Sequence, residues 1–111
     1  MPSVPELTPT EYRTLWPADA ERTAVTLLDV REPDEVAIAA VEHALRIPMR
    51  EVPARLAELD PSKPLVVMCH GGGRSRRVAE YLAQNGFGNV FNLTGGIDAW
   101  SREIDPSIPR Y

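Results

Sequence analysis

The hydrophobic and polar positions of this chain follow a pattern of short strands that alternate with helices. Residues 24–30 and 90–93 are apolar and include β-branched side chains, which predicts two strands. Residues 65–68 read Leu-Val-Val-Met without alternation, which favours a strand buried on both faces of a parallel sheet. Apolar spacing and helix-start residues predict helices over residues 9–16, 33–38, 52–59, 75–84 and 96–100.

Residues with strong conformational preferences mark the ends of these helices. Thr8 can cap the first helix, Pro9 suits its first position, and Glu11 can reach back to the cap. Asn85 and Gly86 end the fourth helix. Because strands alternate with helices, the pattern predicts an α/β fold with a mainly parallel sheet and helices on both faces. In such sheets ligands bind beyond the carboxyl ends of the strands.

Length and charge narrow the class of protein. A chain of 111 residues supports one domain, which we place at residues 1–111, and its Pro-containing ends, residues 1–9 and 105–111, are expected to be peripheral. The net charge of −4 argues against general nucleic-acid binding. We find neither an apolar run of membrane-spanning length nor a signal-peptide pattern, so we expect no membrane partner and a cytoplasmic location.

The only cysteine, Cys69, directly follows the central predicted strand. Three glycines at positions 71–73 come after it, then Arg74, and a helix is predicted from about Ser75. The unpaired amides at a helix start bind anions and stabilise a thiolate over a thiol. A lone cysteine after an apolar run is usually a small buried hydrophobe. The position of Cys69 at the strand end, beside a glycine loop and arginines, favours a nucleophile instead.

The single cysteine also excludes several kinds of site. It cannot form an internal disulfide or the dithiol of a thioredoxin-like motif. Together with His70 and the distant His43 it does not supply the ligands of a zinc site. The three glycines are not a phosphate-binding P-loop, because no Lys-Ser or Lys-Thr pair follows at the required offset. We therefore predict neither a metal nor a cofactor.

The segment around Cys69 resembles the active-site loop of the rhodanese (sulfurtransferase) family, Cys-x-x-Gly-x-Arg-Ser, matched by Cys69, Gly72, Arg74 and Ser75. Two further motifs match in the family's order: Leu28-Asp29-Val30-Arg31-Glu32, and the closing segment with Gly86-Phe87, Val90, Leu93, Gly95-Gly96 and Trp100. The resemblance covers nearly the whole chain and implies the small α/β rhodanese fold, in agreement with the strand and helix pattern.

The resemblance also implies an activity, that of a thiosulfate sulfurtransferase-type transferase. Cys69 would take sulfur from a small anionic donor such as thiosulfate, or from a persulfide, and pass it to cyanide, a thiol or a protein acceptor. The expected binding residues are those of the loop and the helix start: His70, Gly71, Gly72, Gly73, Arg74 and Ser75. Arg74 would hold the anionic part of the donor, with Arg76 and Arg77 as further candidates.

Other conspicuous residues are assigned supporting roles. Asp29 and Arg31 are expected to form a structural network that fixes the loop after their strand, and His70 to face solvent at a loop tip. Trp16 and Trp100 are expected to pack in or around the core. The chain departs from the family at residues 39–44, where Ala39, Ala40 and His43 stand in place of the family's Gly-His-Ile-x-Gly-Ala pattern, so the path of this loop is not determined.

Two alternatives from other functional classes stay open. A phosphatase of the related fold uses Cys-x5-Arg, whereas four residues separate Cys69 from Arg74 here and Ser75 stands at the position of that arginine. A module that carries a persulfide without turnover, or regulates through it, would need the same cysteine. The sequence separates the phosphatase well and the carrier poorly, and it does not identify the physiological donor or acceptor.

Overall fold

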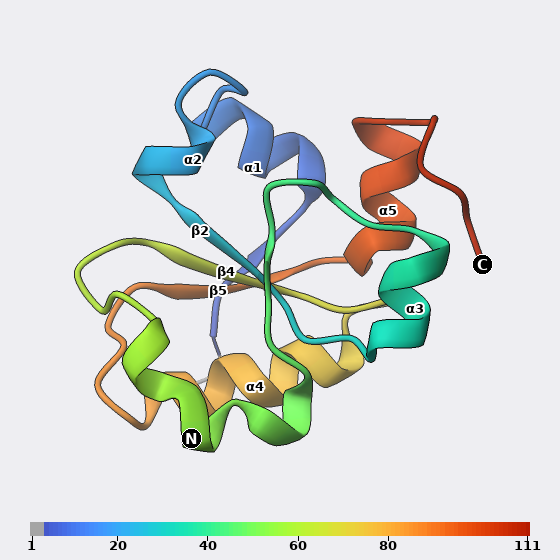
Figure 1. Cartoon of the computed structure of the whole chain (residues 1–111). Helices are drawn as coiled ribbons and strands as arrows, with labels where there is room; N and C mark the ends of the chain where they lie inside the picture. The colour runs from blue at the N-terminus through green and yellow to red at the C-terminus, as the bar shows by residue number, and fades with distance from the viewer. Residues whose placement is uncertain (1–3) are drawn as a thin grey trace.

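The core of the molecule is a five-stranded sheet in which every neighbouring pair of strands is parallel (Figure 1). The computed structural model describes residues 4–111. The strands are β1 (Glu6–Leu7), β2 (Thr26–Asp29), β3 (Leu45–Arg46), β4 (Leu65–Met68) and β5 (Val90–Leu93), in the order β1-β5-β4-β2-β3. The predicted α/β fold with a parallel sheet is confirmed.

Helical segments cover both faces of this sheet. The α-helices are α1 (Pro9–Leu15), α2 (Glu21–Ala24), α3 (Pro33–Ile38), α4 (Gly73–Ala83) and α5 (Gly96–Glu103), and the 3-10 helices are η1 (Met49–Glu51) and η2 (Pro53–Glu58). Helix α4 and the two 3-10 helices lie on one face, and α1 and α5 lie on the other (Figure 1).

The central strand β4 contributes to a separate apolar core on each face. Val67 and the following Cys69 lie in the core beneath α4, whereas Val66 and Met68 lie in the core beneath α1 and α5. All four side chains are at most 1 % exposed. This arrangement explains why the strand is apolar at every position, since neither of its faces meets solvent.

The first helix begins as the sequence predicts. Thr8 Oγ1 accepts a hydrogen bond from the amide of Glu11 at 3.1 Å, and the Glu11 carboxylate accepts one from the amide of Thr8 at 2.9 Å. Two amides that the helix leaves unpaired are thereby satisfied. Pro9 occupies the first turn, and the helix closes at Leu15 with Trp16 as its cap.

Several predicted elements differ from the observed ones in type or in extent. The helix expected over residues 52–59 is η2, a 3-10 segment in which Arg55 has non-helical dihedral angles (φ −121°, ψ 21°). The strand expected over residues 24–30 spans only Thr26–Asp29, because Ala24 ends the unpredicted helix α2. The fourth helix begins at Gly73 rather than Ser75. The two-residue strands β1 and β3 were not predicted, since two residues cannot display a period.

The two ends of the chain differ from the expected peripheral role. Of the amino-terminal segment, residues 1–3 lie outside the described residues, and β1 forms one edge of the sheet. At the other end, Ile108 is 8 % exposed and belongs to the core beneath α5, so residues 105–111 are attached to the domain rather than merely peripheral. No helix within residues 4–111 has the length and apolar character needed to cross a membrane.

Candidate active site

The loop that holds Cys69 connects the carboxyl end of β4 to the start of α4. Cys69 is 1 % exposed and is therefore enclosed by the loop that follows it. Gly72 caps α4 with φ at 111°, a left-handed conformation that favours glycine. A Cβ placed on Gly71 or Gly73 would meet no heavy atom within 4 Å, so these two glycines leave open space beside the loop.

Hydrogen-bond donors converge on the sulfur of Cys69. The amide of Gly72 donates to Sγ at 3.1 Å, and Ser75 Oγ lies 3.4 Å from it. Burial raises the pKa of the Cys69 thiol, whereas hydrogen bonds from the Ser75 hydroxyl and from the amides of Ser75, Gly72 and Arg74 lower it. The hydrogen bonds have the larger combined effect, so the pKa of Cys69 lies below its ordinary value. The site therefore favours a thiolate, as the position at a helix start predicts.

The Ser75 hydroxyl is held by a residue of the neighbouring strand. Asn92, in β5, accepts its proton at 2.5 Å, so Asn92 Oδ1 is a closer acceptor than the sulfur. The Asn92 amide group donates to the carbonyl of Gly72 at 3.0 Å and to both carboxylate oxygens of Glu6 at 3.1 Å. Because one hydroxyl has one proton, the backbone amides are the more constant donors to Sγ. Asn92 also fixes the turn at Gly72.

The start of α5 packs directly against the Cys69 loop. Ile97 donates its amide to the carbonyl of Cys69 at 2.9 Å, and Asp98 donates to the carbonyl of His70 at 3.3 Å. Gly96 has φ at 58°, and a Cβ there would overlap both of these carbonyl oxygens. The Gly95-Gly96 turn is thus required for the close approach between the start of α5 and the Cys69 loop.

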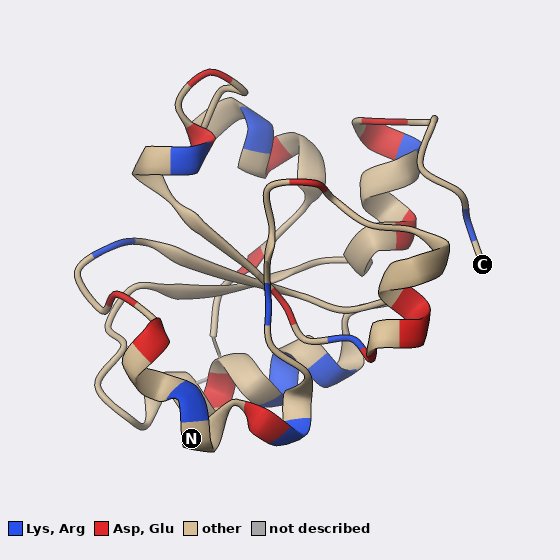
Figure 2. Ribbon diagram, viewed as in Figure 1, with Lys and Arg blue, Asp and Glu red and all other residues tan. Residues whose placement is uncertain are grey.

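Arg74 projects from the first turn of α4 to an acidic residue of α3. Its two terminal nitrogens donate to the two carboxylate oxygens of Glu35 at 2.6 and 2.8 Å. These bonds, with the hydroxyl of Tyr111 and the amide of Glu32, overcome the effect of burial and lower the pKa of Glu35 to about 2. Figure 2 shows basic positions over the first turns of α4 and acidic positions over α3. The predicted anion-binding arginine is therefore paired.

Asp29 and Arg31 form a buried network immediately beyond β2. Both side chains are 0 % exposed, and the carboxylate accepts from Nε at 2.9 Å and from Nη2 at 2.7 Å. Arg31 also donates to the carbonyls of Glu35 and Ala39 and to the hydroxyl of Tyr111. This network holds the middle and the carboxyl end of α3, and with them the carboxylate that holds Arg74.

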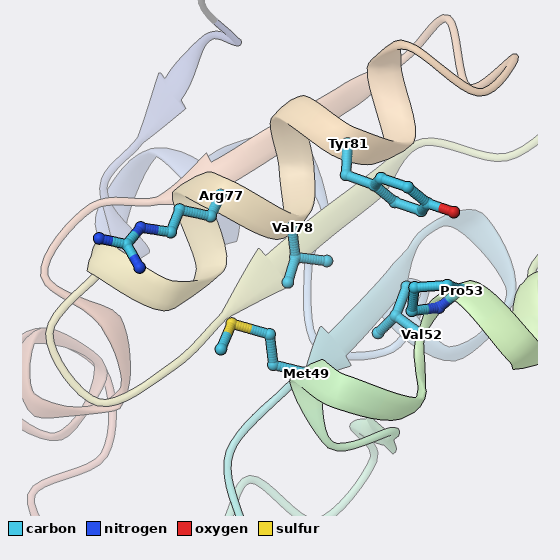
Figure 3. A pocket seen from close by; sticks show the side chains of 6 residues that line it. All are labelled: Met49, Val52, Pro53, Arg77, Val78 and Tyr81. Atoms are coloured by element: carbon cyan, nitrogen blue, oxygen red, sulfur yellow. The ribbon is translucent and has the colours of Figure 1, made fainter.

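The other predicted site residues lie around the rim of the loop. His70 does not face solvent as expected: it is half-buried, and its ring is stacked on that of Tyr111 with the centroids 4.0 Å apart and the planes 12° apart. Arg76 pairs with Glu6 at 3.2 Å on the surface. Arg77 lines an apolar cavity of about 150 Å³ between α4 and the 3-10 segment, together with Met49, Val52, Pro53, Val78 and Tyr81 (Figure 3). Cys69 does not line this cavity.

The departure at residues 39–44 does not reach the sulfur. Ala39 and Val41 are buried in the core beneath α1 and α5, and the carbonyl of Ala39 accepts from Arg31. His43 lies against Glu21, 3.2 Å from its carboxylate, and against the ring of Trp100. Burial lowers the pKa of His43.

Trp16 and Trp100 both contact Tyr12 edge to face, as expected of packing residues. Residues 4–111 contain no group of three or more potential metal ligands.

Three residues that contact the site were missed in the sequence. Glu35 and Tyr111 are far from Cys69 in the chain, and nothing in the sequence pattern pairs them with the loop. Asn92 had a signal, since it is a polar residue within the apolar run Val-Phe-Asn-Leu of a buried strand, and it is 1 % exposed. Buried polar groups require partners, so Asn92 could have been assigned to a hydrogen-bond network.

The loop around Cys69 favours a thiolate, and the chain is similar in sequence to known proteins. A family model, the rhodanese-like domain, matches residues 15–103. A sulfurtransferase of Allochromatium vinosum is 41 % identical over 89 residues, which are 80 % of this chain and 83 % of that protein. The chloroplastic rhodanese-like/PpiC domain-containing protein 12 of Arabidopsis thaliana is 45 % identical over 89 residues.

Coverage differs between these relatives. The match includes 77 % of this chain but only 30 % of the Arabidopsis protein. Among solved structures, a rhodanese-like domain protein from Staphylococcus aureus superposes with a TM-score of 0.79 at 29 % identity, covering 97 % of this chain and 99 % of that one. The chain therefore belongs to the rhodanese-like domain family.

Proposed function

We propose that this protein is a sulfurtransferase that moves sulfane sulfur from thiosulfate or a persulfide donor to a thiophilic acceptor through a persulfide on Cys69. Family membership and a relative named a sulfurtransferase support sulfur transfer in general. The observation that carries the specific proposal is the position of Sγ, buried at the start of α4 with the amide of Gly72 at 3.1 Å.

The reaction consists of two displacements. In the first, the Cys69 thiolate attacks the outer sulfur of thiosulfate, a bond forms between Sγ and that sulfur, and sulfite leaves with the electron pair of the broken S–S bond. In the second, cyanide, a thiolate or a protein thiol attacks the terminal sulfur, and Cys69 leaves as a thiolate. The amides of residues 70–74 stabilise the negative charge on the terminal sulfur between the two steps.

Arg74 contributes positive charge at the entrance to this cradle. A guanidinium has five N–H donors, and Glu35 accepts from two of them. The N–H groups that Glu35 does not use would bind the anionic part of thiosulfate, while Glu35 keeps the guanidinium plane fixed. In this scheme Arg74 binds the donor and Glu35 is a positioning residue.

The proposal is tested by mass spectrometry of the intact protein. Incubation with thiosulfate should add the mass of one sulfur atom to each chain, because Cys69 is the only thiol. Addition of cyanide should remove that mass and release thiocyanate in equal amount. Protein that gains no sulfur from either thiosulfate or a persulfide donor would refute the proposed function.

Replacement of Arg74 should affect charged donors selectively. Arg74→Ala is expected to raise KM for thiosulfate by a factor equivalent to about 1.5–3 kcal/mol, the usual value of a charge-assisted hydrogen bond. Arg76→Ala is the matched control, since Arg76 lies in the same turn but pairs with Glu6 on the surface. Steady-state kinetics with thiosulfate and with an uncharged donor, such as a dialkyl trisulfide, separate the effects. Equal losses for both donors would show that Arg74 supports the loop only.

A further inference from the structure

The carboxyl-terminal segment returns from the end of α5 toward the Cys69 loop. Ser101 Oγ donates to the carbonyl of Ile108 at 2.6 Å, and the Ile108 side chain lies in the core. This attachment turns the following residues back along α5, so that the chain ends beside α3 (Figure 1). We call Arg110 and Tyr111, which follow this turn, the strap.

The strap is fastened on both sides of His70. Arg110 donates to the Asp98 carboxylate from Nε at 2.8 Å and from Nη2 at 3.3 Å, and the amide of Asp98 in turn holds the carbonyl of His70. The ring of Tyr111 lies flat on the imidazole of His70, with the centroids 4.0 Å apart. The strap therefore immobilises the residue that follows the reactive cysteine.

The hydroxyl of Tyr111 connects the strap to α3. It accepts from Arg31 Nη1 at 2.9 Å and donates to Glu35 Oε2 at 2.8 Å, the same carboxylate that holds Arg74. Only a group that both donates and accepts can satisfy this pair of partners. Tyr111 thus contacts the partner of Arg74 as well as the neighbour of Cys69.

This placement leaves the two sides of the loop unequal. On one side Gly71 and Gly73 have open space beside them, and on the other the strap covers His70. Cys69 is 1 % exposed, so little of Sγ is open to a donor from solvent. We propose that the strap makes Cys69 selective for small sulfur donors over donors on a bulky carrier, and that releasing it admits the bulky ones. The statement about donors rests on the proposed function.

One anchor of the strap lies on the surface. The Arg110–Asp98 ion pair is exposed, with the two side chains 57 % and 28 % accessible, and such pairs contribute little. Tyr111 is 37 % exposed. If the open form is about a tenth of the population, complete release should increase the reaction of bulky reagents about ten-fold.

Thiol labelling tests the strap independently of sulfur transfer, because the protein has one cysteine. Rates are measured with methyl methanethiosulfonate, a small reagent, and with 5,5′-dithiobis(2-nitrobenzoate), a bulky aromatic one. Tyr111→Ala should accelerate the bulky reagent about ten-fold and the small one less than about two-fold. Arg110→Ala, which removes the other anchor, should act in the same direction. The ratio of the two rates cancels changes in thiol ionisation.

Arg102→Ala is the matched control, since Arg102 also pairs with Asp98, at 3.4 Å, but lies outside the strap. It should leave the ratio unchanged. In the corresponding kinetic assay, Tyr111→Ala should raise kcat/KM for glutathione persulfide relative to thiosulfate. An unchanged labelling ratio in both folded strap variants, or equal acceleration of both reagents, would overturn the strap proposal. Absence of sulfur transfer with an altered ratio would overturn the proposed function and leave the strap in place.

Discussion

Cys69→Ser is expected to abolish sulfur transfer. The hydroxyl of serine remains protonated at neutral pH even in an amide-lined loop, and an oxygen cannot carry the persulfide on which both displacements depend. The loss of kcat/KM should be on the order of 10³-fold or more, as for other nucleophile replacements. The assay is thiocyanate release from thiosulfate and cyanide, and the same variant should acquire no sulfur mass.

Two features of the chain make this test decisive. Cys69 is the only cysteine, so no second thiol can substitute for it. Serine is nearly isosteric and retains the contacts of the buried position, so the variant should keep the circular dichroism spectrum of the fold. Ser75→Ala is the matched control: it removes a hydroxyl 3.4 Å from Sγ but keeps the sulfur and should retain measurable turnover. Turnover by Cys69→Ser close to that of the unaltered protein would contradict a cysteine persulfide.

The main elements of the fold could be predicted because their side chains report local burial. The uninterrupted apolar run at β4 and the capping residues before α1 are both patterns that a few consecutive residues display. The segment around η2 could not be predicted in this way, since amphipathic spacing does not distinguish a 3-10 turn from an α-helix over so few residues. The strands β1 and β3 depend on pairing with distant strands and carry no local pattern.

The residues of the candidate site also fall into two groups, those close together in the sequence and those brought together by the tertiary fold. Cys69, Gly72 and Ser75 lie within one strand–loop–helix connection, and the sequence placed them together because their spacing is local. The bond between Arg74 and Glu35 joins residues 39 apart, and the stack of Tyr111 on His70 joins two segments that meet only once α5 has packed. Such contacts arise from the tertiary fold, so neither composition nor periodicity could predict that the carboxyl-terminal segment reaches the loop.

Asp29→Ala is expected to cause the largest loss of stability of any single substitution discussed. Removal of the carboxylate leaves the guanidinium of Arg31 buried without its counter-ion. Burial acts to lower the pKa of Arg31, but the hydrogen bonds with Asp29 and Tyr111 outweigh it and raise that pKa. Breaking a buried ion pair on one side typically costs about 3–5 kcal/mol. Urea unfolding followed by circular dichroism should therefore show a markedly lower midpoint.

The control for this substitution is Asp34→Ala, an exposed carboxylate in the same helix that Arg31 supports. Its effect should stay within about 0.5 kcal/mol, the usual range for a surface position. A double variant, Asp29→Leu with Arg31→Met, should lose less than Asp29→Ala alone, because no unpaired charge remains. A loss below about 1 kcal/mol for Asp29→Ala would mean that water reaches Arg31. In that case the network would not be what holds α3, and the placement of Glu35 opposite Arg74 would depend on the bonds from Tyr111 and Arg74 themselves.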